Sequence, residues 1–378
     1  MIIGGGIIGS SIAYHLARQG RRVLVAERSQ LSAKPTASWA SAGGIRRQGR
    51  AAAEAALATE ASARWPHLAD ELGADLGYRQ GGNLLVAESE TQAARLATFV
   101  RKQHEMGFVD VRLLDRQELR ALAPHLAEHL VAASYSPADG QADSVRTTHA
   151  FAAAAERSGA TCWTGTPTVA LLAKHGRVYG ARTARADVAA DTVILAAGAW
   201  SDALATGVGL HLPIRTAVYQ MLRSTPTENI KLGPVLGCVG RRLSLKQLAD
   251  GTFLLGGGWP GDATDDRLGY RLREASIVAN WSTACDILPP LRTLRVAQAW
   301  CGLEAQSVDE LPLIGPAPGF EGLLLAVGFS GHGFAIAPAV GRAVADQLAG
   351  RPTPELDGLS PNRIGGLDPL ALDTFLNS

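Results

Sequence analysis

The order of apolar, glycine and polar positions at the start of the chain predicts a strand, a tight turn, a helix and a second strand. Two isoleucines precede the run GGGIIG, and apolar residues at positions 8, 12 and 16 then recur at helical spacing. Gly20 follows as a typical helix end, so we expect the helix to cover residues 7–19. Residues 22–26 are mostly apolar, and Glu27 comes directly after them. This order is typical of a β-α-β unit.

The remaining pattern predicts a mixture of helices and strands, with strands dominating after Pro213. Residues 192–197 are almost wholly apolar, as in a strand that is covered on both faces of a parallel sheet. Later apolar runs are separated by turn signals without crossover helices, which indicates a largely antiparallel sheet. The strand near residue 300 is expected to lead into a long polar loop. Helical spacing predicts helices over residues 51–72, 90–106, 115–122, 144–157 and 270–288, and one that opens near Pro338.

The glycines of the first turn are candidates for binding a dinucleotide. Gly4, Gly6 and Gly9 form the pattern G-x-G-x-x-G. In this pattern the first glycine allows a sharp turn, the second brings the backbone close to a pyrophosphate, and the third lets the helix pack against the strand. Glu27 comes 18 residues after Gly9, where a carboxylate can accept hydrogen bonds from an adenosine ribose. The glycine pattern alone is weak, but its place before a helix and an acidic strand end indicates a dinucleotide site.

The polar, basic segment at residues 29–50 is a second candidate for ligand contact. A solvated basic loop is the alternative interpretation, but the position directly after the dinucleotide half-site favours cofactor contact. The segment offers hydroxyl donors, glycines that let the backbone approach a ligand, and fixed positive charge, at Ser38, Ser41, Gly43, Gly44, Arg46 and Arg47.

Composition narrows the class of protein. The chain has 378 residues, of which 47% are hydrophobic, enough to bury a large core in about two domains. Its 36 basic and 35 acidic residues leave a net charge of +1, which gives no global attraction to nucleic acid or anionic lipid. The four cysteines are far apart, so we expect no metal site. The sequence opens without a basic leader and has no apolar run long enough to span a bilayer, so we expect a cytoplasmic protein without a transmembrane segment.

Five motifs in one order resemble the D-amino-acid oxidase (DAO) superfamily of FAD-dependent oxidoreductases. Within it, the chain is similar to the branch of glycine oxidase, sarcosine oxidase beta subunits and D-hydroxyproline dehydrogenases. The motifs are GGGIIG with Glu27, ASWASAGGIR at residues 37–46, ILAAGAWS at 194–201, DELPLIGP at 309–316 and GFSGHGF at 328–334.

The resemblance implies an α/β fold with two domains. A Rossmann-like FAD-binding domain of the GR2 type would be joined by a second, α+β substrate domain built on a mixed, largely antiparallel sheet. We expect the FAD-binding domain to comprise residues 1–77, 138–212 and 310–378, and the substrate domain residues 78–137 and 213–309.

The resemblance also implies non-covalent FAD. Some relatives tether the flavin through a cysteine near Cys301, but here that residue is one position out of register. Residues 331–333 would lie against the pyrimidine side of the flavin, where N–H groups stabilise the reduced form. The cofactor contacts carried over are Gly4, Gly6, Ile7, Ile8, Gly9, Glu27, Arg28, Ser38, Ser41, Ala42, Gly43, Gly44, Val169, Ala197, Gly198, Trp200, Gly302, Gly331, His332, Gly333 and Phe334.

The activity that the resemblance implies is oxidation of an amine or amino acid, such as a D-amino acid, a glycine- or sarcosine-like compound or a cyclic imino acid. Hydride would pass from the alpha carbon to flavin N5, and the imine would then hydrolyse. The chemistry needs few acid–base groups, because positioning is the main contribution of the protein. The candidate catalytic residues are His332, Arg46, Glu304 and Tyr219, with Gln220 as a further possible ligand contact.

One departure from the family bears on the substrate. Many relatives have an arginine after the motif W-x-G-L that grips the substrate carboxylate, and this chain has Glu304 there. Either another arginine, such as Arg46, Arg47 or Arg242, holds the carboxylate, or the substrate lacks one and Glu304 pairs with a cationic amine. The first alternative is favoured, because Arg46 and Arg47 already lie in the cofactor segment.

The electron acceptor and partners stay open at this point. Oxygen, a quinone or a partner redox subunit are the alternatives. Oxidases of this group tend to keep a lysine near flavin N5, and Lys246 is not a convincing equivalent, so a dehydrogenase is favoured. The chain could instead be the flavin-bearing subunit of a larger dehydrogenase, active only with electron-transfer partners, and homo- or hetero-oligomers are both compatible with the sequence. An NAD-dependent dehydrogenase is a third class, which the motifs at residues 194–201 and 328–334 disfavour.

Overall fold

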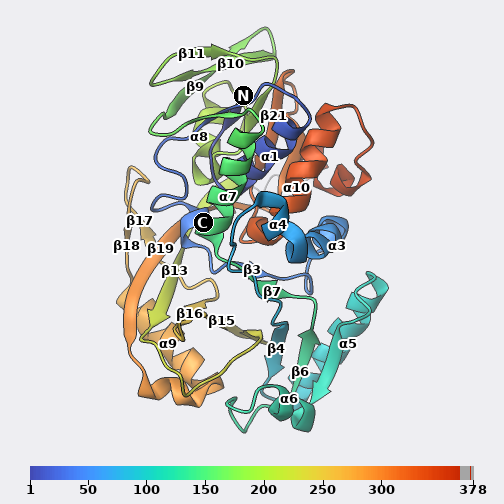
Figure 1. Ribbon diagram of the computed structural model, residues 1–378, viewed down its shortest axis with the longest axis vertical. Coiled ribbons are helices and arrows are strands. Elements are labelled where there is room, and N and C mark those ends of the chain that lie inside the picture. Colours follow the sequence, from blue (N-terminus) through green and yellow to red (C-terminus); the bar gives the residue numbers. More distant parts are fainter. Residues whose placement is uncertain (367–374, 376–378) are drawn as a thin grey trace.

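Two large β-sheets, one above the other along the long axis of the molecule, carry the fold of the computed structural model (Figure 1). The structure describes residues 1–366 and 375. The chain crosses between the upper and lower halves several times, so each half is built from segments far apart in the sequence. The predicted α/β class with a mixed second sheet is confirmed.

The upper half is organised around a six-stranded sheet. Its strands run parallel except for the edge strand β20, and β1 lies in the middle, with Ile2 opposite both Val25 and Ile194. Such a central strand is covered on both faces, which explains its wholly apolar sequence. The strands, in spatial order, are β20 (Leu313–Pro316), β21 (Leu323–Val327), β12 (Val193–Leu195), β1 (Ile2–Ile3), β2 (Leu24–Ala26) and β8 (Thr161–Trp163).

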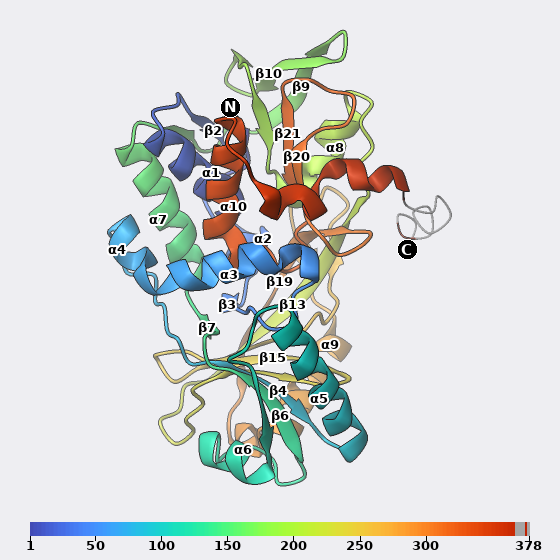
Figure 2. The same ribbon diagram turned by 90° about the vertical axis from the view of Figure 1, so that its right-hand side faces the viewer.

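Three helices pack side by side against this sheet: α1 (Ile7–Arg18), α7 (Ser144–Arg157) and α10 (Gly333–Leu348) (Figure 2). Their apolar faces form the larger core of the protein. A three-stranded sheet covers the top of this half, with β9 (Thr168–Lys174), β10 (Arg177–Thr183) and β11 (Asp187–Ala189). The 3-10 turn η3 (Gly198–Trp200) and helix α8 (Ser201–Thr206) follow β12.

The lower half is an eight-stranded sheet. All neighbouring strands are antiparallel except β4 and β14, so the expected largely antiparallel sheet is present. Helices α5 (Glu90–Glu105), α6 (Arg116–Leu122) and α9 (Glu274–Ile287) accompany it, the last two contributing to a second core. The strands, in spatial order, are β19 (Val296–Ser307), β13 (Ile214–Ser224), β16 (Phe253–Gly256), β15 (Arg241–Gln247), β14 (Val235–Cys238), β4 (Asn83–Ala87), β6 (Ala132–Ser136) and β5 (Arg112–Asp115).

Short elements join the two halves. The segment after β2 contains α2 (Ala37–Ala40) and β3 (Gly44–Ile45), which pairs with β7 (Gly140–Gln141). The hairpin β17 (Asp262–Ala263) and β18 (Tyr270–Arg271) precedes α9, and η4 (Pro289–Thr293) follows it. The chain then ends, as far as it is described, in η5 (Pro354–Leu359) and η6 (Pro361–Gly366).

The six-stranded sheet takes all its strands from residues 1–77, 138–212 and 310–378, and the eight-stranded sheet from the remaining segments. This division supports the two expected domains, whose exact boundaries stay a prediction. Residues 367–374 and 376–378, at the end of the expected FAD-binding domain, lie outside the described residues.

Four local predictions were wrong. The expected helix over residues 51–72 is broken into η1 (Ala52–Glu54), α3 (Ala55–Arg64), η2 (Trp65–His67) and α4 (Leu68–Leu72), because Pro66 cannot donate a helical hydrogen bond. The helix expected from residue 270 begins at Glu274, after strand β18. The loop expected after residue 307 contains strand β20, which pairs with β21. The last helix begins at Gly333, so Pro338 lies inside it.

Side chains from neighbouring elements donate to carbonyl groups of helix α10 around Pro338. The Pro338 carbonyl accepts from Arg64 Nη1 at 2.6 Å, and that of Ala335 accepts from Trp65 Nε1 at 2.8 Å. From α1, Ser11 Oγ donates to the Ala337 carbonyl at 2.8 Å. These contacts fix the first turns of α10 against α1 and α3, although proline removes one of its own hydrogen bonds.

Close contact between α1 and α10 depends on Gly341. A Cβ atom at this position would overlap the side chain of Ser11 and lie 2.7 Å from its backbone carbon. We therefore expect Gly341→Val to lower the free energy of unfolding by roughly 2 kcal/mol or more, since overpacking forces the two helices apart. Chemical denaturation measures the effect. The matched control is Gly233→Val, where a Cβ meets no atom within 4 Å. Equal stability of the two variants would contradict the tight helix crossing.

Candidate active site

A cavity of about 890 Å³ lies between the two large sheets. This volume is at the upper end of the range for small-molecule sites. Its walls come from the first glycine turn, the segment at residues 36–50, the turn after β12, strands β13 and β19, and the loop between β21 and α10. The sequence motifs noted above, separated by up to about 300 residues, therefore face one space.

At one end of the cavity, the N-terminus of α1 is open to a ligand. Gly6 occupies the N-cap position and has no side chain to cap the helix. The backbone N–H of Ile7 donates to Ser38 Oγ at 2.9 Å, which leaves the hydroxyl proton of Ser38 free to donate to an anion. Free N–H groups and the positive end of the helix dipole make this a favourable place for phosphate groups.

Glu27 holds the glycine turn in shape from the end of β2. Its carboxylate accepts from the backbone N–H of Gly5 at 2.7 Å and from that of Ser29 at 3.0 Å. Burial raises the pKa of this carboxyl above its usual range, and the two N–H donors act in the opposite direction. Glu27 and Arg28 both line the cavity, and the Arg28 guanidinium lies 4.7 Å from the centre of the Trp200 ring.

Two of the predicted cofactor residues do not line the cavity. A Cβ at Gly9 would overlap the carbonyl oxygen of Gly4, so this glycine allows α1 to pack against the first strand. Gly43 faces the carbonyl of Ala142 in the same way, with Lys246 Nζ 3.2 Å from its Cβ position. All the other predicted cofactor residues line the cavity, from Gly4 to Phe334.

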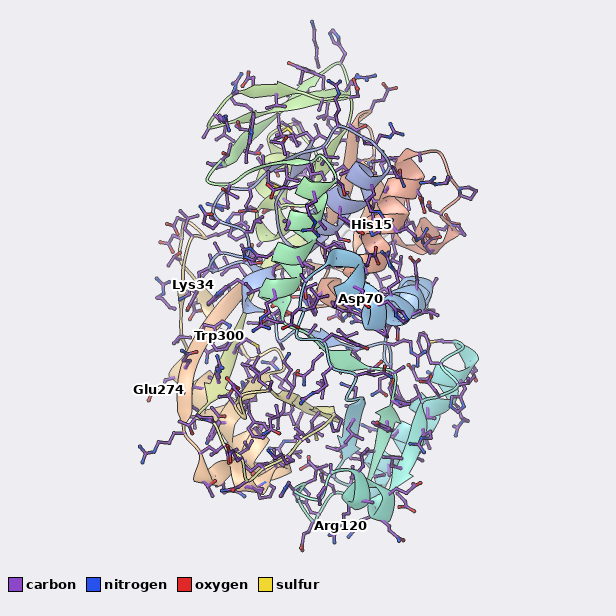
Figure 3. All side chains as sticks on the ribbon, viewed as in Figure 1. His15, Lys34, Asp70, Arg120, Glu274 and Trp300 are labelled. Carbon is purple, nitrogen blue, oxygen red and sulfur yellow. The ribbon has the colours of Figure 1, made fainter. Side chains whose placement is uncertain are left out.

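The segment at residues 34–40 packs against strand β19, and Lys34 and Trp300 lie on the same side of the molecule (Figure 3). The rings of Trp39 and Trp300 are 6.1 Å apart, and Lys34 Nζ lies 5.1 Å from the Trp39 ring centre. A Cβ at Gly302 would overlap that of Ala40. Gly302 therefore allows close approach of this segment to the sheet.

At the other end, the four predicted catalytic residues, His332, Arg46, Glu304 and Tyr219, all line the cavity. Glu304 accepts a hydrogen bond from the backbone N–H of Gly331 at 2.5 Å. Burial raises the pKa of Glu304 to about 7, an effect that this hydrogen bond partly offsets. Burial and the nearby Glu304 raise the pKa of Tyr219 above its usual range.

The arginines of the cofactor segment point in different directions. Arg47 bonds to Asp110 and lies 5.0 Å from the centre of the Phe108 ring, so it does not line the cavity. Arg242 also lies outside the lining, 6.0 Å from the Trp259 ring centre. Of the three arginines considered as carboxylate anchors, only Arg46 reaches the cavity.

Arg50 is a site residue that the sequence analysis missed. It lines the cavity, its side chain is 6% exposed, and its Nη1 atom has no hydrogen-bond partner within the described residues. Burial lowers the pKa of Arg50 to about 10, which still leaves it charged at neutral pH. The run GGIRRQGR contained the signal, since Arg50 follows Arg46 by four positions in the same basic segment.

Three further residues lie away from the cavity. Gln220, expected as a possible ligand contact, faces the opposite side of β13 from Tyr219 and bonds to the backbone of Arg273. Cys301 is fully buried, with Gln220 Oε1 3.8 Å from its sulfur. Lys246 is buried behind Gly43, where loss of solvation lowers its pKa to about 7.

The described residues contain neither a cluster suited to a metal ion nor a helix suited to a membrane. Within residues 1–366 and 375, no group of three or more His, Cys, Asp or Glu side chains is arranged to hold a metal ion. No helix in this described part of the chain has the length and apolar character needed to cross a membrane.

Known proteins with similar sequences are amine and amino-acid oxidoreductases. Human mitochondrial dimethylglycine dehydrogenase is 27% identical over 97% of this chain, which spans 44% of that protein's length. Glycine oxidase of Bacillus licheniformis is 27% identical, with 93% of each chain covered. An opine oxidase subunit of Agrobacterium tumefaciens (strain Ach5) is 29% identical over 96% of each chain.

A solved structure agrees with these sequence similarities. L-proline dehydrogenase from P. horikoshii superposes with a TM-score of 0.88 at 26% identity, covering 96% of each chain. Residues 1–347 match the family DAO, described as FAD dependent oxidoreductase. One cavity is lined by the glycine turn, Glu27 and the GFSGHGF motif. The N-terminus of α1 at this cavity has no side-chain cap, so these residues fit a dinucleotide cofactor. The chain belongs to the DAO family of FAD-dependent oxidoreductases.

Proposed function

We propose that this protein is a dehydrogenase that oxidises an amine carrying a carboxylate group, such as a D-amino acid, a glycine- or sarcosine-like compound or a cyclic imino acid. The observation that carries the proposal is the cavity itself, whose lining combines dinucleotide-binding features with two arginines, Arg46 and the buried Arg50. Bound FAD supplies the acceptor for the hydride from the alpha carbon, and the imine product hydrolyses in water.

The chain would hold FAD through groups that are already in position. The α1 N-terminus and the Ser38 hydroxyl suit the pyrophosphate, and Glu27 and the backbone of Val169 suit the adenosine. The N-cap of α10, His332, also lines the cavity, so a second helix N-terminus faces the space. Because its dipole favours negative charge, we place the pyrimidine edge of the flavin there. The Cys301 sulfur lies off the cavity, which supports non-covalent binding.

Arg46 and Arg50 are the proposed carboxylate anchor. Their guanidinium groups have Glu54 and Asp139 as acidic neighbours, and Arg50 keeps one unpartnered nitrogen in the described structure. A buried donor without a partner is costly, so a ligand oxygen at this position would satisfy it. The planar guanidinium fork matches the geometry of a carboxylate. Many relatives have an arginine at the position of Glu304 that grips the substrate carboxylate. This arrangement supports the interpretation that Arg46 and Arg50, from another segment, take over that role.

Glu304 is compatible with this anchor. A carboxyl with a pKa of about 7 is partly protonated at neutral pH, so it repels a substrate carboxylate less than an ordinary glutamate would. When ionised, it could pair with the substrate amine. Oxidation of an amine without a carboxylate, with Glu304 as the specificity residue, is therefore the alternative substrate class.

For the acceptor, we propose a quinone, a dye or a partner redox subunit rather than oxygen, because Lys246 lies behind Gly43 and off the cavity wall. One of the similar proteins is a subunit of an opine oxidase. This supports the second candidate function, a flavin-bearing subunit that is active only with partner chains, and also a hetero-oligomer. The four cysteines are free thiols, as is usual in a reducing compartment, and this supports a cytoplasmic protein.

Anaerobic bleaching of the bound flavin tests the proposal. Glycine, sarcosine, D- and L-proline and D-alanine are compared with amines of the same size that lack a carboxylate. We expect one or more of the carboxylate compounds to bleach the flavin, and dye reduction to be much faster than peroxide formation. Bleaching by the plain amines alone would contradict the carboxylate anchor, and a flavin that nothing reduces would favour the partner-dependent subunit.

Arg50→Gln should raise KM for the carboxylate substrate roughly 10- to 100-fold, because a charge-assisted hydrogen bond contributes about 1.5–3 kcal/mol. Steady-state dye reduction measures KM and kcat. Arg47→Gln is the matched control, since Arg47 lies in the same segment but bonds to Asp110 outside the cavity. Similar increases in KM for both variants would argue against a specific role of Arg50.

Glu304→Gln tests the protonation of the buried carboxyl. The pKa of Glu304 rises from 4.5 to about 7 on folding, so the folded state binds this proton more tightly than the unfolded state. Its contribution to stability is complete below pH 4.5 and is lost as pH rises through 7. Wild type should therefore lose on the order of 2 kcal/mol relative to Glu304→Gln between pH 5 and pH 8, measured by chemical denaturation. Glu321→Gln, at an exposed ion pair, is the control. A difference independent of pH would refute the assignment.

A further inference from the structure

Glu54 is a buried acid that the proposed chemistry does not yet use. It ends the 3-10 helix η1, directly before α3, and its side chain is fully buried. Neither carboxylate oxygen accepts a well-formed hydrogen bond from the described residues. The Nδ1 atom of His332 lies 3.2 Å from Glu54 Oε2, within ion-pair distance. Glu54 thus links the N-terminus of α3 to the N-cap of α10, which lines the cavity.

A buried carboxylate without a counter-charge is costly, so its neighbours must compensate for it. Arg50 and Arg46 are two of them, because the Glu54 carboxyl favours the charged form of both guanidinium groups and so partly offsets the lowering of their pKa by burial. His332 is the third. A carboxylate beside Nδ1 fixes that nitrogen as a donor, which leaves Nε2 as the nitrogen available to a ligand.

The charges around this corner of the cavity nearly cancel. Arg46 and Arg50 are opposed by Glu54 and by Asp139, whose pKa burial raises to about 6. Glu304, on β19, adds acid near the Gly331 backbone. Glu355 of η5 is bonded to Arg342, which Glu60 and Asp346 share. Carboxylate binding therefore depends on how each donor on the cavity wall is oriented, and the His332 ring is the wall residue that Glu54 contacts.

We propose that Glu54 is a positioning residue for His332. It holds the imidazole through the 3.2 Å contact at Nδ1, so that His332 joins Arg46 and Arg50 in facing the substrate carboxylate. This inference rests on the proposed function, because it assumes that a carboxylate enters the cavity. It also gives a reason for a fully buried acid in an otherwise alanine-rich segment: the acid acts through the histidine rather than on the ligand.

The proposed role predicts that the effect of Glu54→Gln on carboxylate affinity changes sign when His332 is replaced. A merely structural residue would not produce this change. As a bare negative charge, Glu54 would repel a carboxylate, so Glu54→Gln alone would strengthen its binding. If Glu54 acts through His332, the same substitution weakens binding when His332 is present and strengthens it when His332 is replaced. A double-mutant cycle separates these cases.

The cycle uses the FAD-loaded protein with acetate as the probe. Acetate binding is followed through the visible spectrum of the bound flavin in wild type, Glu54→Gln, His332→Gln and the double variant. We expect Glu54→Gln to raise the Kd for acetate roughly three- to tenfold in wild type and to lower it in the His332→Gln background. Glu60→Gln, on α3 but bonded to Arg342, is the matched control and should leave the Kd unchanged.

Other outcomes identify which claim fails. If Glu54→Gln strengthens acetate binding in both backgrounds, or acts equally in both, the positioning role is refuted and the proposed function stands. If acetate leaves the flavin spectrum unchanged in FAD-loaded wild type, the carboxylate site of the proposed function fails, and this inference with it. Should Glu54→Gln not fold, Glu54→Asp withdraws the charge from His332. It should weaken acetate binding only when His332 is present, and equal effects in both backgrounds would refute the role.

Discussion

The close crossing of α1 and α10 is the constraint on which the site depends. Gly341 lets the two helices meet at Ser11, and both helices then begin at the wall of the same cavity. Each N-terminus carries unpaired N–H groups and a partial positive charge. A cofactor with negative charge at two separated points, a pyrophosphate and a reduced flavin edge, matches this arrangement. The upper half of the molecule thus provides electrostatics that are fixed before any ligand binds.

The lower sheet closes the cavity and carries the polar groups that we propose face the substrate. Tyr219 and Glu304 alternate with buried residues along β13 and β19, so one face of the sheet serves the site and the other serves the core. The cofactor segment lies between the two sheets and contributes Arg46 and Arg50. Substrate choice can therefore change through residues of this segment and this face, while the helix crossing that orients the cofactor stays the same.

The sequence was sufficient where structure follows from local pattern, and insufficient where it follows from distant contacts. The first β-α-β unit and the helix over residues 144–157 were predicted well, because glycine turns and apolar spacing determine them. The start of α10 was misplaced, because a proline such as Pro338 is typical of the opening of a helix, whereas this helix begins at Gly333 and packs against α1 and α3, which are distant in sequence. Glu54 was missed because a charged residue in an alanine-rich segment looks solvent-exposed until its neighbours are known, and Arg50 because one arginine of a basic run looks like the others until the fold buries it.

A crystal structure of the FAD-loaded protein with an unreactive carboxylate, such as acetate, tests the central claim most directly. We expect the flavin to lie along the cavity from the α1 N-terminus to the α10 N-terminus. We also expect carboxylate oxygens about 2.7–2.9 Å from guanidinium nitrogens of Arg46 or Arg50. A carboxylate bound elsewhere in the cavity, out of hydrogen-bond reach of both arginines, would contradict this expectation.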